Sequence, residues 1–131
     1  MTPLVRGFYN ARCPASPSLD DPMSAPAAEA VLMVTVSCPP ERAEALAGQL
    51  VEARLAACVN IVPAVRSIYR WQGAVQADDE SLLLIKTAES RFEALKAFVL
   101  DHHPYELPEV VAVKLSPAHR PYLAWVLENT L

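Results

Sequence analysis

The chain has 131 residues, of which 53% are hydrophobic, and its formal net charge is -4. This length and apolar content are enough for one domain with one core. The acidic balance and the lack of any Lys/Arg block argue against nucleic acid or an anionic membrane surface as the main partner. There is no apolar run of roughly 18–20 residues and no signal-peptide core, so we expect a cytoplasmic protein without a membrane segment.

The first 30 residues contain five prolines among Ser, Ala and Asp, and they show neither helical nor strand periodicity. Such composition is typical of disorder. We therefore predict a disordered N-terminal extension at residues 1–30 and a single folded domain at residues 31–131. Residues 1–22 precede Met23 and are expected to be an upstream extension without a function of their own.

The first element of the domain is an apolar, β-branched run at Val31–Val36, which predicts a buried strand. Ser37 is a candidate helix N-cap, and Pro39 and Pro40 are compatible only with a first helical turn. Apolar residues at helical spacing then predict an amphipathic helix that reaches Leu55.

A long hairpin follows. The segment 58–71 is rich in Val, Ile and aromatic residues, as strands are, and Pro63 marks a bulge or an edge position. The residues Gln72–Gly73 supply a turn, after which extended structure resumes at 74–76 and 81–87. Arms of about 14 residues reach about 45 Å, whereas a domain of about 100 residues is only about 35 Å across. The hairpin should therefore extend beyond its own domain.

The last third of the chain completes the pattern. A capping box at Ser90 and Glu93 predicts a second helix, which ends before Pro104. The segment 110–115 predicts a short strand, and Pro121 opens a final helix. The side chains expected on the inner side of that helix are Tyr122, Trp125 and Val126. The order β-α-β-β-α-β plus a helix is the pattern of ferredoxin-like α+β folds.

Two helices cover only one face of the predicted sheet, so a partner subunit is expected to cover the other face. Arg66, Tyr69, Arg70 and Trp71 on the hairpin resemble a nucleic-acid stacking platform. The acidic residues at 78–80 favour another interpretation, in which the arginines pair with these acids and the aromatic residues anchor a subunit interface.

The chemically densest segment is 101–109, which holds two imidazoles and three carboxylates between a helix and a strand. Histidine with carboxylate or thiolate suits copper, nickel or zinc. Adjacent histidines diverge on regular backbone, so a site would need one imidazole together with Glu109, Cys38 or a group from another subunit. In the alternative, His103 packs at the helix end and bonds backbone carbonyls while His102 is solvated.

The remaining motifs are sparse. Cys13, Cys38 and Cys58 form an odd set without C-x-x-C spacing, which suggests neither disulfides nor a zinc knuckle. Cys58 lies in an apolar run and is expected to be a small buried hydrophobe. No nucleotide-binding or hydrolase motif is present, so we expect a protein that is not an enzyme.

Five segments occur in a characteristic order: LVEARLAACVNIVP (50–63), SIYRWQG (67–73), LIKT (84–87), HPYELPE (103–109) and YLAW (122–125). Together they resemble the CutA divalent-cation tolerance family, and the resemblance runs from about Val31 to Thr130. It implies a ferredoxin-like protomer in a homotrimer similar to PII signalling proteins, with hairpins that embrace neighbouring subunits. It also implies tolerance of copper and other divalent metals, with copper binding in some members.

Carried onto this chain, the metal-associated region of the family matches His102, His103 and Glu109, and Cys38 is the thiol nearest the first-strand position where relatives carry cysteine. We therefore expect a trimer that binds divalent metal. Its possible ligands are these four residues, and Cu(II) is the first candidate metal. The alternative is a PII-like signalling or scaffold trimer that binds a small ligand or a partner protein in clefts between subunits.

Overall fold

The computed structural model of this chain describes residues 29–131. The predicted extension at 1–30 therefore lies outside the described residues, except for its last two. The Glu29 carboxylate accepts a hydrogen bond from the backbone N–H of Ser90 (2.6 Å), and the Ala30 carbonyl accepts one from the same turn (2.9 Å). The contacts of the domain thus begin just before its first strand.

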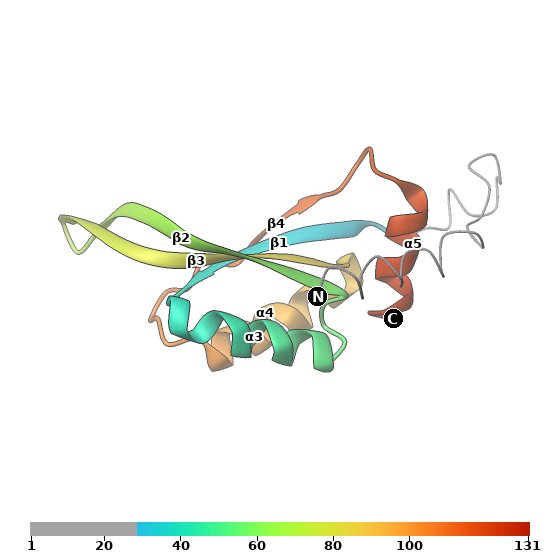
Figure 1. Cartoon of the computed structure of the whole chain (residues 1–131), viewed down its shortest axis with the longest axis horizontal. Helices are drawn as coiled ribbons and strands as arrows, with labels where there is room; N and C mark the ends of the chain where they lie inside the picture. The colour runs from blue at the N-terminus through green and yellow to red at the C-terminus, as the bar shows by residue number, and fades with distance from the viewer. Residues whose placement is uncertain (1–28) are drawn as a thin grey trace.

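The elements follow in the order β1 (Val31–Cys38), α3 (Pro40–Glu52), β2 (Cys58–Trp71), β3 (Ala74–Ala88), η2 (Glu89–Arg91), α4 (Phe92–His102), β4 (Val111–Lys114) and α5 (Arg120–Glu128). The strands form an antiparallel sheet in the order β2-β3-β1-β4 (Figure 1). This arrangement is the predicted ferredoxin-like α+β fold, with α5 as an additional C-terminal helix. Among the described residues, no helix is both long and apolar enough to cross a bilayer.

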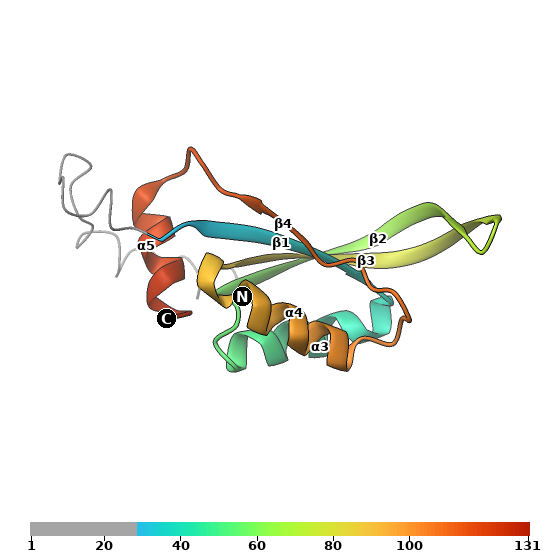
Figure 2. The same cartoon turned by 180° about the vertical axis from the view of Figure 1, so that it is seen from behind.

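Helices α3 and α4 cover one face of the sheet (Figures 1 and 2). Alternate residues of β1 and β3 face these helices, and the cross-strand pair Val34 and Ile85 is fully buried. Leu50 from α3 and Leu95 from α4 are also fully buried and belong to the same apolar cluster. The core therefore lies between the sheet and these two helices.

The hairpin of β2 and β3 projects beyond the rest of the domain, as predicted (Figure 1). The pairing register shifts beside Pro63, where a bulge was predicted, and Ala64 there has a φ of 59°. Gln72 (φ 49°) and Gly73 (φ 81°) form the two-residue turn. β3 runs without a break, so the predicted interruption at 77–80 is wrong: cross-strand pairing with β2 holds this acidic stretch extended.

The opposite face of the sheet is uncovered in the single chain. We call it the open face and define it by Met33, Thr35, Leu82, Leu84, Val111 and Val113, which alternate with the buried strand residues and pair across strands. Val111 and Val113 are 55% and 56% exposed. Cys58 pairs with Lys86 on this face and is only partly buried, so its prediction as a buried hydrophobe is wrong. Apolar exposure on this scale is typical of an interaction surface.

Two predicted helix caps are not formed. Ser37 lies inside β1, because the strand continues to Cys38, and the N-cap of α3 is Pro39, without a side-chain hydrogen bond. Ser90 lies in η2, and the N-cap of α4 is Arg91, again without a side-chain bond. The backbone amide of Ser90, which the Glu93 side chain of a capping box would bond, is instead bonded by the Glu29 carboxylate, which precedes the domain predicted from sequence.

The C-terminal helix packs at the end of the sheet, against β1 and β3. Val126 is fully buried as predicted, whereas Tyr122 and Trp125 are partly buried and stack with ring centroids 5.7 Å apart. Arg54, which follows α3, donates from Nη2 to the Glu128 carbonyl (2.8 Å). This bond satisfies a carbonyl at the end of α5 and ties that helix to the α3–β2 connection.

Candidate functional site

A group of titratable side chains lies where the hairpin leaves the sheet. Cys38 ends β1 and pairs with Ser81 of β3, and Glu80 directly precedes Ser81. The hydroxyl of Tyr105, from the loop after α4, donates to Glu80 Oε2 (2.7 Å). The ring of His103 lies 4.6 Å from that of Tyr105, centroid to centroid. We call Cys38, Tyr69, Asp78, Glu80, His103 and Tyr105 the hairpin-base cluster.

Glu80 is the buried carboxylate of this cluster, with only 6% of its surface exposed. A buried carboxylate is costly unless hydrogen bonds to it replace water, and Tyr105 supplies such a bond. Burial, followed by the bond to Glu80, raises the pKa of Tyr105, so this phenol remains a donor at neutral pH. Tyr69 donates to Asp78 in the same way, and that bond raises the pKa of Tyr69.

Cys38 is fully buried within the apolar core. Burial, and then the negative charge of Glu80, raises the pKa of the Cys38 thiol. Metal ligation requires the thiolate. The raised pKa of Cys38 therefore opposes the loss of the thiol proton that metal ligation requires.

His103 is also buried, at 8% exposure, and both of its ring nitrogens are engaged. The backbone N–H of Tyr105 donates to Nδ1 (3.1 Å), and Nε2 lies 2.8 Å from the carbonyl oxygen of Ser37. Because an amide can only donate, Nδ1 accepts and Nε2 carries the proton. The geometry thus corresponds to the alternative in which His103 bonds a backbone carbonyl, and it fixes the loop to the end of β1.

His102 is oriented quite differently. Its Nδ1 lies 2.8 Å from the Phe98 carbonyl oxygen, and its ring stacks on Phe98 with centroids 4.0 Å apart. The side chain is 37% exposed, and within the described residues Nε2 makes no hydrogen bond. Of the two adjacent imidazoles, only His102 therefore has a ring nitrogen without a hydrogen bond in the described part of the chain.

Glu109 lies on another surface, since its Oε2 accepts a hydrogen bond from Thr35 Oγ1 (3.3 Å) on the open face. Thr35 and Cys38 are three residues apart in one strand, so their side chains project to opposite faces of the sheet. His102 lies away from both, on the helical layer. Within the described part of one chain, no three His, Cys, Asp or Glu side chains gather into a metal-binding group.

Sequence reasoning missed Glu80 as a site residue, because three consecutive acids at 78–80 suggest a solvated run. The informative signal is position: Glu80 directly precedes Ser81, the β3 residue that pairs with the last residue of β1. An acid at the point where a hairpin enters the body of a domain is partly enclosed, whereas acids further out are not. Arg66 and Asp79, one step further out, form the predicted ion pair (2.9 Å) with both side chains more than half exposed.

A ferredoxin-like sheet with an open face, a long bulged hairpin and an HPYELPE loop at its base together place this chain in the class of PII-like folds. A family model described as CutA1 divalent ion tolerance protein matches residues 31–129. The chain belongs to this family, which confirms the resemblance predicted from its segments.

Individual relatives agree with this assignment. The divalent-cation tolerance protein CutA of Thermus thermophilus is 52% identical over 102 residues, covering 78% of this chain and 98% of that protein. Human protein CutA is 47% identical over 96 residues, which cover 72% of this chain and 54% of that protein. The chain thus spans about half the length of that mammalian relative. A chloroplastic CutA of Arabidopsis thaliana is 38% identical over 130 residues, 99% of this chain and 71% of that protein.

Solved structures show the same fold. The structure of the Thermus thermophilus divalent cation tolerance protein superposes with a TM-score of 0.74 at 50% identity, covering 76% of this chain and 98% of that chain. A structure titled PII-like protein CutA from Nostoc sp. PCC 7120 in apo form superposes with a TM-score of 0.73 at 37% identity, covering 76% and 97%.

Proposed function

We propose that this chain acts in divalent-cation tolerance as a non-enzymatic homotrimer that binds Cu(II) or another divalent cation at sites shared between subunits. Membership of the divalent ion tolerance family supports the relation to divalent cations. The observation that carries the proposal is the separation of the candidate ligands onto different surfaces of one chain. A complete ligand set then requires a second chain.

Assembly is supported by the apolar surface that one chain leaves exposed. On the open face Val113 is 56% exposed, and on the hairpin Ile68 and Val75 are 70% and 66% exposed. Val75 pairs with Arg70, and Arg70 lies two residues after Ile68 in the same strand. Ile68 and Val75 therefore project to the same side of the hairpin. Covering these side chains in a trimer removes them from water and protects the sheet edges.

The metal ligands that we propose are His102, through Nε2, and the Glu109 carboxylate of a neighbouring subunit. Imidazole with carboxylate suits Cu(II) by ligand type. His103 and Cys38 are further candidates, but each first has to change state: His103 must give up a ring hydrogen bond and Cys38 must lose its proton. The compartment that we propose is the cytoplasm, where a partly exposed thiol such as Cys58 stays reduced.

Mixed trimers test whether the site is shared. His102→Ala and Glu109→Ala chains with different tags are co-expressed, trimers that contain both are isolated, and bound copper is counted by native mass spectrometry. A site built from His102 of one chain and Glu109 of the next leaves one intact site in every mixed trimer and none in either pure variant trimer. Mixed trimers without copper contradict a shared site, and pure variants that bind as wild type contradict both ligands.

A second candidate function is a PII-like sensor that binds a small ligand beside the hairpin-base cluster. The buried Glu80 carboxylate and its Tyr105 partner favour this alternative, because they place a fixed charge and a phenol at the base of the hairpin. A metabolite thermal-shift screen at constant ionic strength tests it, since a specific ligand raises the melting temperature. The rise should vanish in Glu80→Gln, and a rise that persists in this variant places the ligand elsewhere.

A further inference from the structure

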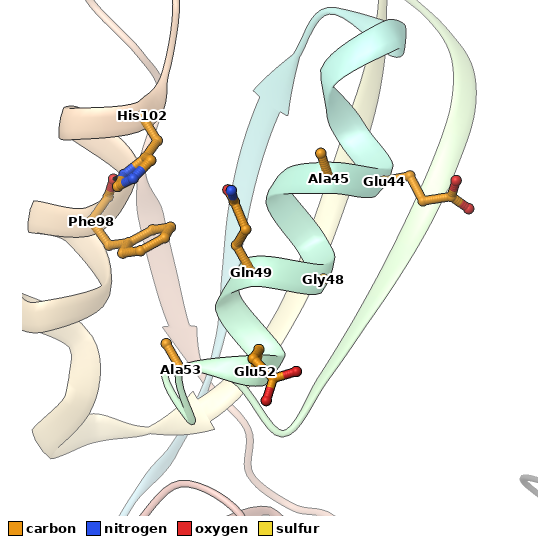
Figure 3. Close-up of a pocket in the computed structure, with 8 residues that line it drawn as sticks. All are labelled: Glu44, Ala45, Gly48, Gln49, Glu52, Ala53, Phe98 and His102. Atoms are coloured by element: carbon orange, nitrogen blue, oxygen red, sulfur yellow. Dashed lines mark hydrogen bonds between the residues drawn. The ribbon is translucent and has the colours of Figure 1, made fainter.

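A shallow groove of about 680 Å³ lies over the surface of α3, and one of its flanks is formed by α4 (Figure 3). Both helices lie on one face of the sheet, so the groove is on the opposite side of the domain from the open face. A partner subunit that covers the open face therefore leaves the α3 side of the groove accessible. The proposed metal ligation uses His102 at one end of the groove, and neither it nor the proposed trimer gives a role to the α3 residues that line the rest.

Gly48 lies at the middle of the groove, inside α3. A glycine in a helix interior destabilises the helix by roughly 0.5–1 kcal/mol relative to alanine. Nothing in the fold requires glycine at this position: its φ is not in the left-handed region, and a Cβ built on it meets no atom within 4 Å. The missing side chain thus leaves open space above the helix backbone, where an external group can approach closely.

The α4 flank of the groove is aromatic and fixed in position. Phe98 and His102 project from α4 toward α3, with their rings stacked at an interplanar angle of 14° (Figure 3). The Nδ1 atom of His102 lies within hydrogen-bond distance of the Phe98 carbonyl oxygen. The backbone carbonyl of His102 accepts a hydrogen bond from Arg42 Nη2 at the start of α3 (2.9 Å). The two helices are therefore linked at this end, and the groove is formed before any partner arrives.

The other flank is acidic. Glu44 and Glu52 extend from the side of α3 that faces away from α4 (Figure 3), and within the described residues neither forms an ion pair. Each lies four residues from Gly48, so the two carboxylates are separated by eight helical residues, or about 12 Å along the axis. A partner that complements this flank carries positive charges at a similar separation.

From these features we propose that the groove docks a helical segment of a partner protein with small or apolar residues along one side and Lys or Arg residues about 12 Å apart along the other. The small contact residues lie over Gly48 and pack against Phe98, and the basic residues pair with Glu44 and Glu52. Residues eight positions apart on a helix laid along α3 are about 12 Å apart, which matches the separation of the two carboxylates. This is the helix-in-groove mode of recognition.

A displayed library of 18-residue helical peptides tests the proposal with the full-length chain as target. Enrichment of peptides with Lys or Arg eight positions apart beside an apolar stripe is expected, and raising the salt concentration should weaken their binding. Binding should fall at least tenfold in Gly48→Gln, which fills the groove, and in the double variant Glu44→Lys/Glu52→Lys. Glu106→Gln, which alters one exposed carboxylate in the loop after α4, should bind as wild type.

The melting temperature of each variant identifies any loss that reflects unfolding, and Gly48→Gln should fold because glutamine favours a helix more than glycine does. The proposal is overturned if no peptides are enriched, if the enriched peptides are acidic or uncharged, or if binding is the same in the groove variants as in wild type. Binding only by extended peptides, or self-association through the groove, also overturns it in favour of another occupant.

Discussion

The hydroxyl of Tyr105 donates a 2.7 Å hydrogen bond to Oε2 of Glu80, a residue 25 positions earlier in the chain. The bond joins the loop after α4 to the base of the β2–β3 hairpin. The same loop is bound to the end of β1 through His103, whose Nε2 lies 2.8 Å from the Ser37 carbonyl. Loop, hairpin and first strand are therefore held together at one place.

Tyr105→Phe should destabilise the chain by about 1–3 kcal/mol, because it removes a donor from a buried carboxylate that is only 6% exposed. Urea denaturation of both proteins measures the difference. Tyr69→Phe is the matched control: its partner Asp78 is exposed, so water replaces the lost bond and the cost should be smaller. Equal losses in the two variants would show that the burial of Glu80 is not what gives the Tyr105 bond its effect.

The raised pKa of Tyr105 predicts a dependence of stability on high pH. Burial, and then the bond to Glu80, raises this pKa above the ordinary value of 10.0, so the folded chain holds the phenol proton more tightly than the unfolded chain does. The corresponding stabilisation is complete below about pH 10 and is lost as the pH rises beyond it. Phenolate absorbance should show late ionisation of both Tyr69 and Tyr105 in wild type, and one fewer late-ionising tyrosine in Tyr105→Phe. An unchanged titration curve in the variant contradicts the assignment.

Sequence patterns predicted the fold well because hydrophobic periodicity and turn chemistry act locally. The bulge beside Pro63 and the turn at Gln72–Gly73 follow from the residues themselves. The capping box at Ser90 fails for a physical reason: the amide that it would satisfy is bonded by Glu29, 61 residues away in sequence. Long-range partners of this kind leave no local signal.

The candidate site was harder to predict. The sequence places His102 and His103 side by side, yet the end of α4 orients one against Phe98 and the other toward Ser37. Their different roles depend on the tertiary position of β1, which spacing does not reveal. Glu80 was overlooked for a similar reason, since only the enclosure of the hairpin base separates it from its exposed acidic neighbours.

Val113→Asp should disrupt the proposed trimer, because it places a charge on the edge strand of an apolar open face that a neighbouring subunit would cover. Native mass spectrometry should show the mass falling from trimer to monomer. Val51→Asp is the control, as Val51 is 42% exposed on α3, on the other side of the domain. Trimers that persist in Val113→Asp would place the interface elsewhere.

Gly48→Ala should stabilise the chain by about 0.5–1 kcal/mol, since alanine is the better helix former and its Cβ meets no neighbouring atom. Chemical denaturation measures this gain. Gly73→Ala should instead lower stability, because Gly73 has a φ of 81° in the hairpin turn. A loss of stability in Gly48→Ala would contradict the open space over α3.

The central claim is that this chain binds divalent metal through His102, and anaerobic calorimetric titration with Cu(II) tests it most directly. Wild-type protein should give saturable heat. His102→Ala should bind Cu(II) much more weakly. His103→Ala should retain binding in the fraction that remains folded, since both ring nitrogens of His103 already form hydrogen bonds to the backbone. The absence of saturable heat in wild type, or binding that is unchanged in a His102→Ala/His103→Ala double variant, would contradict the account.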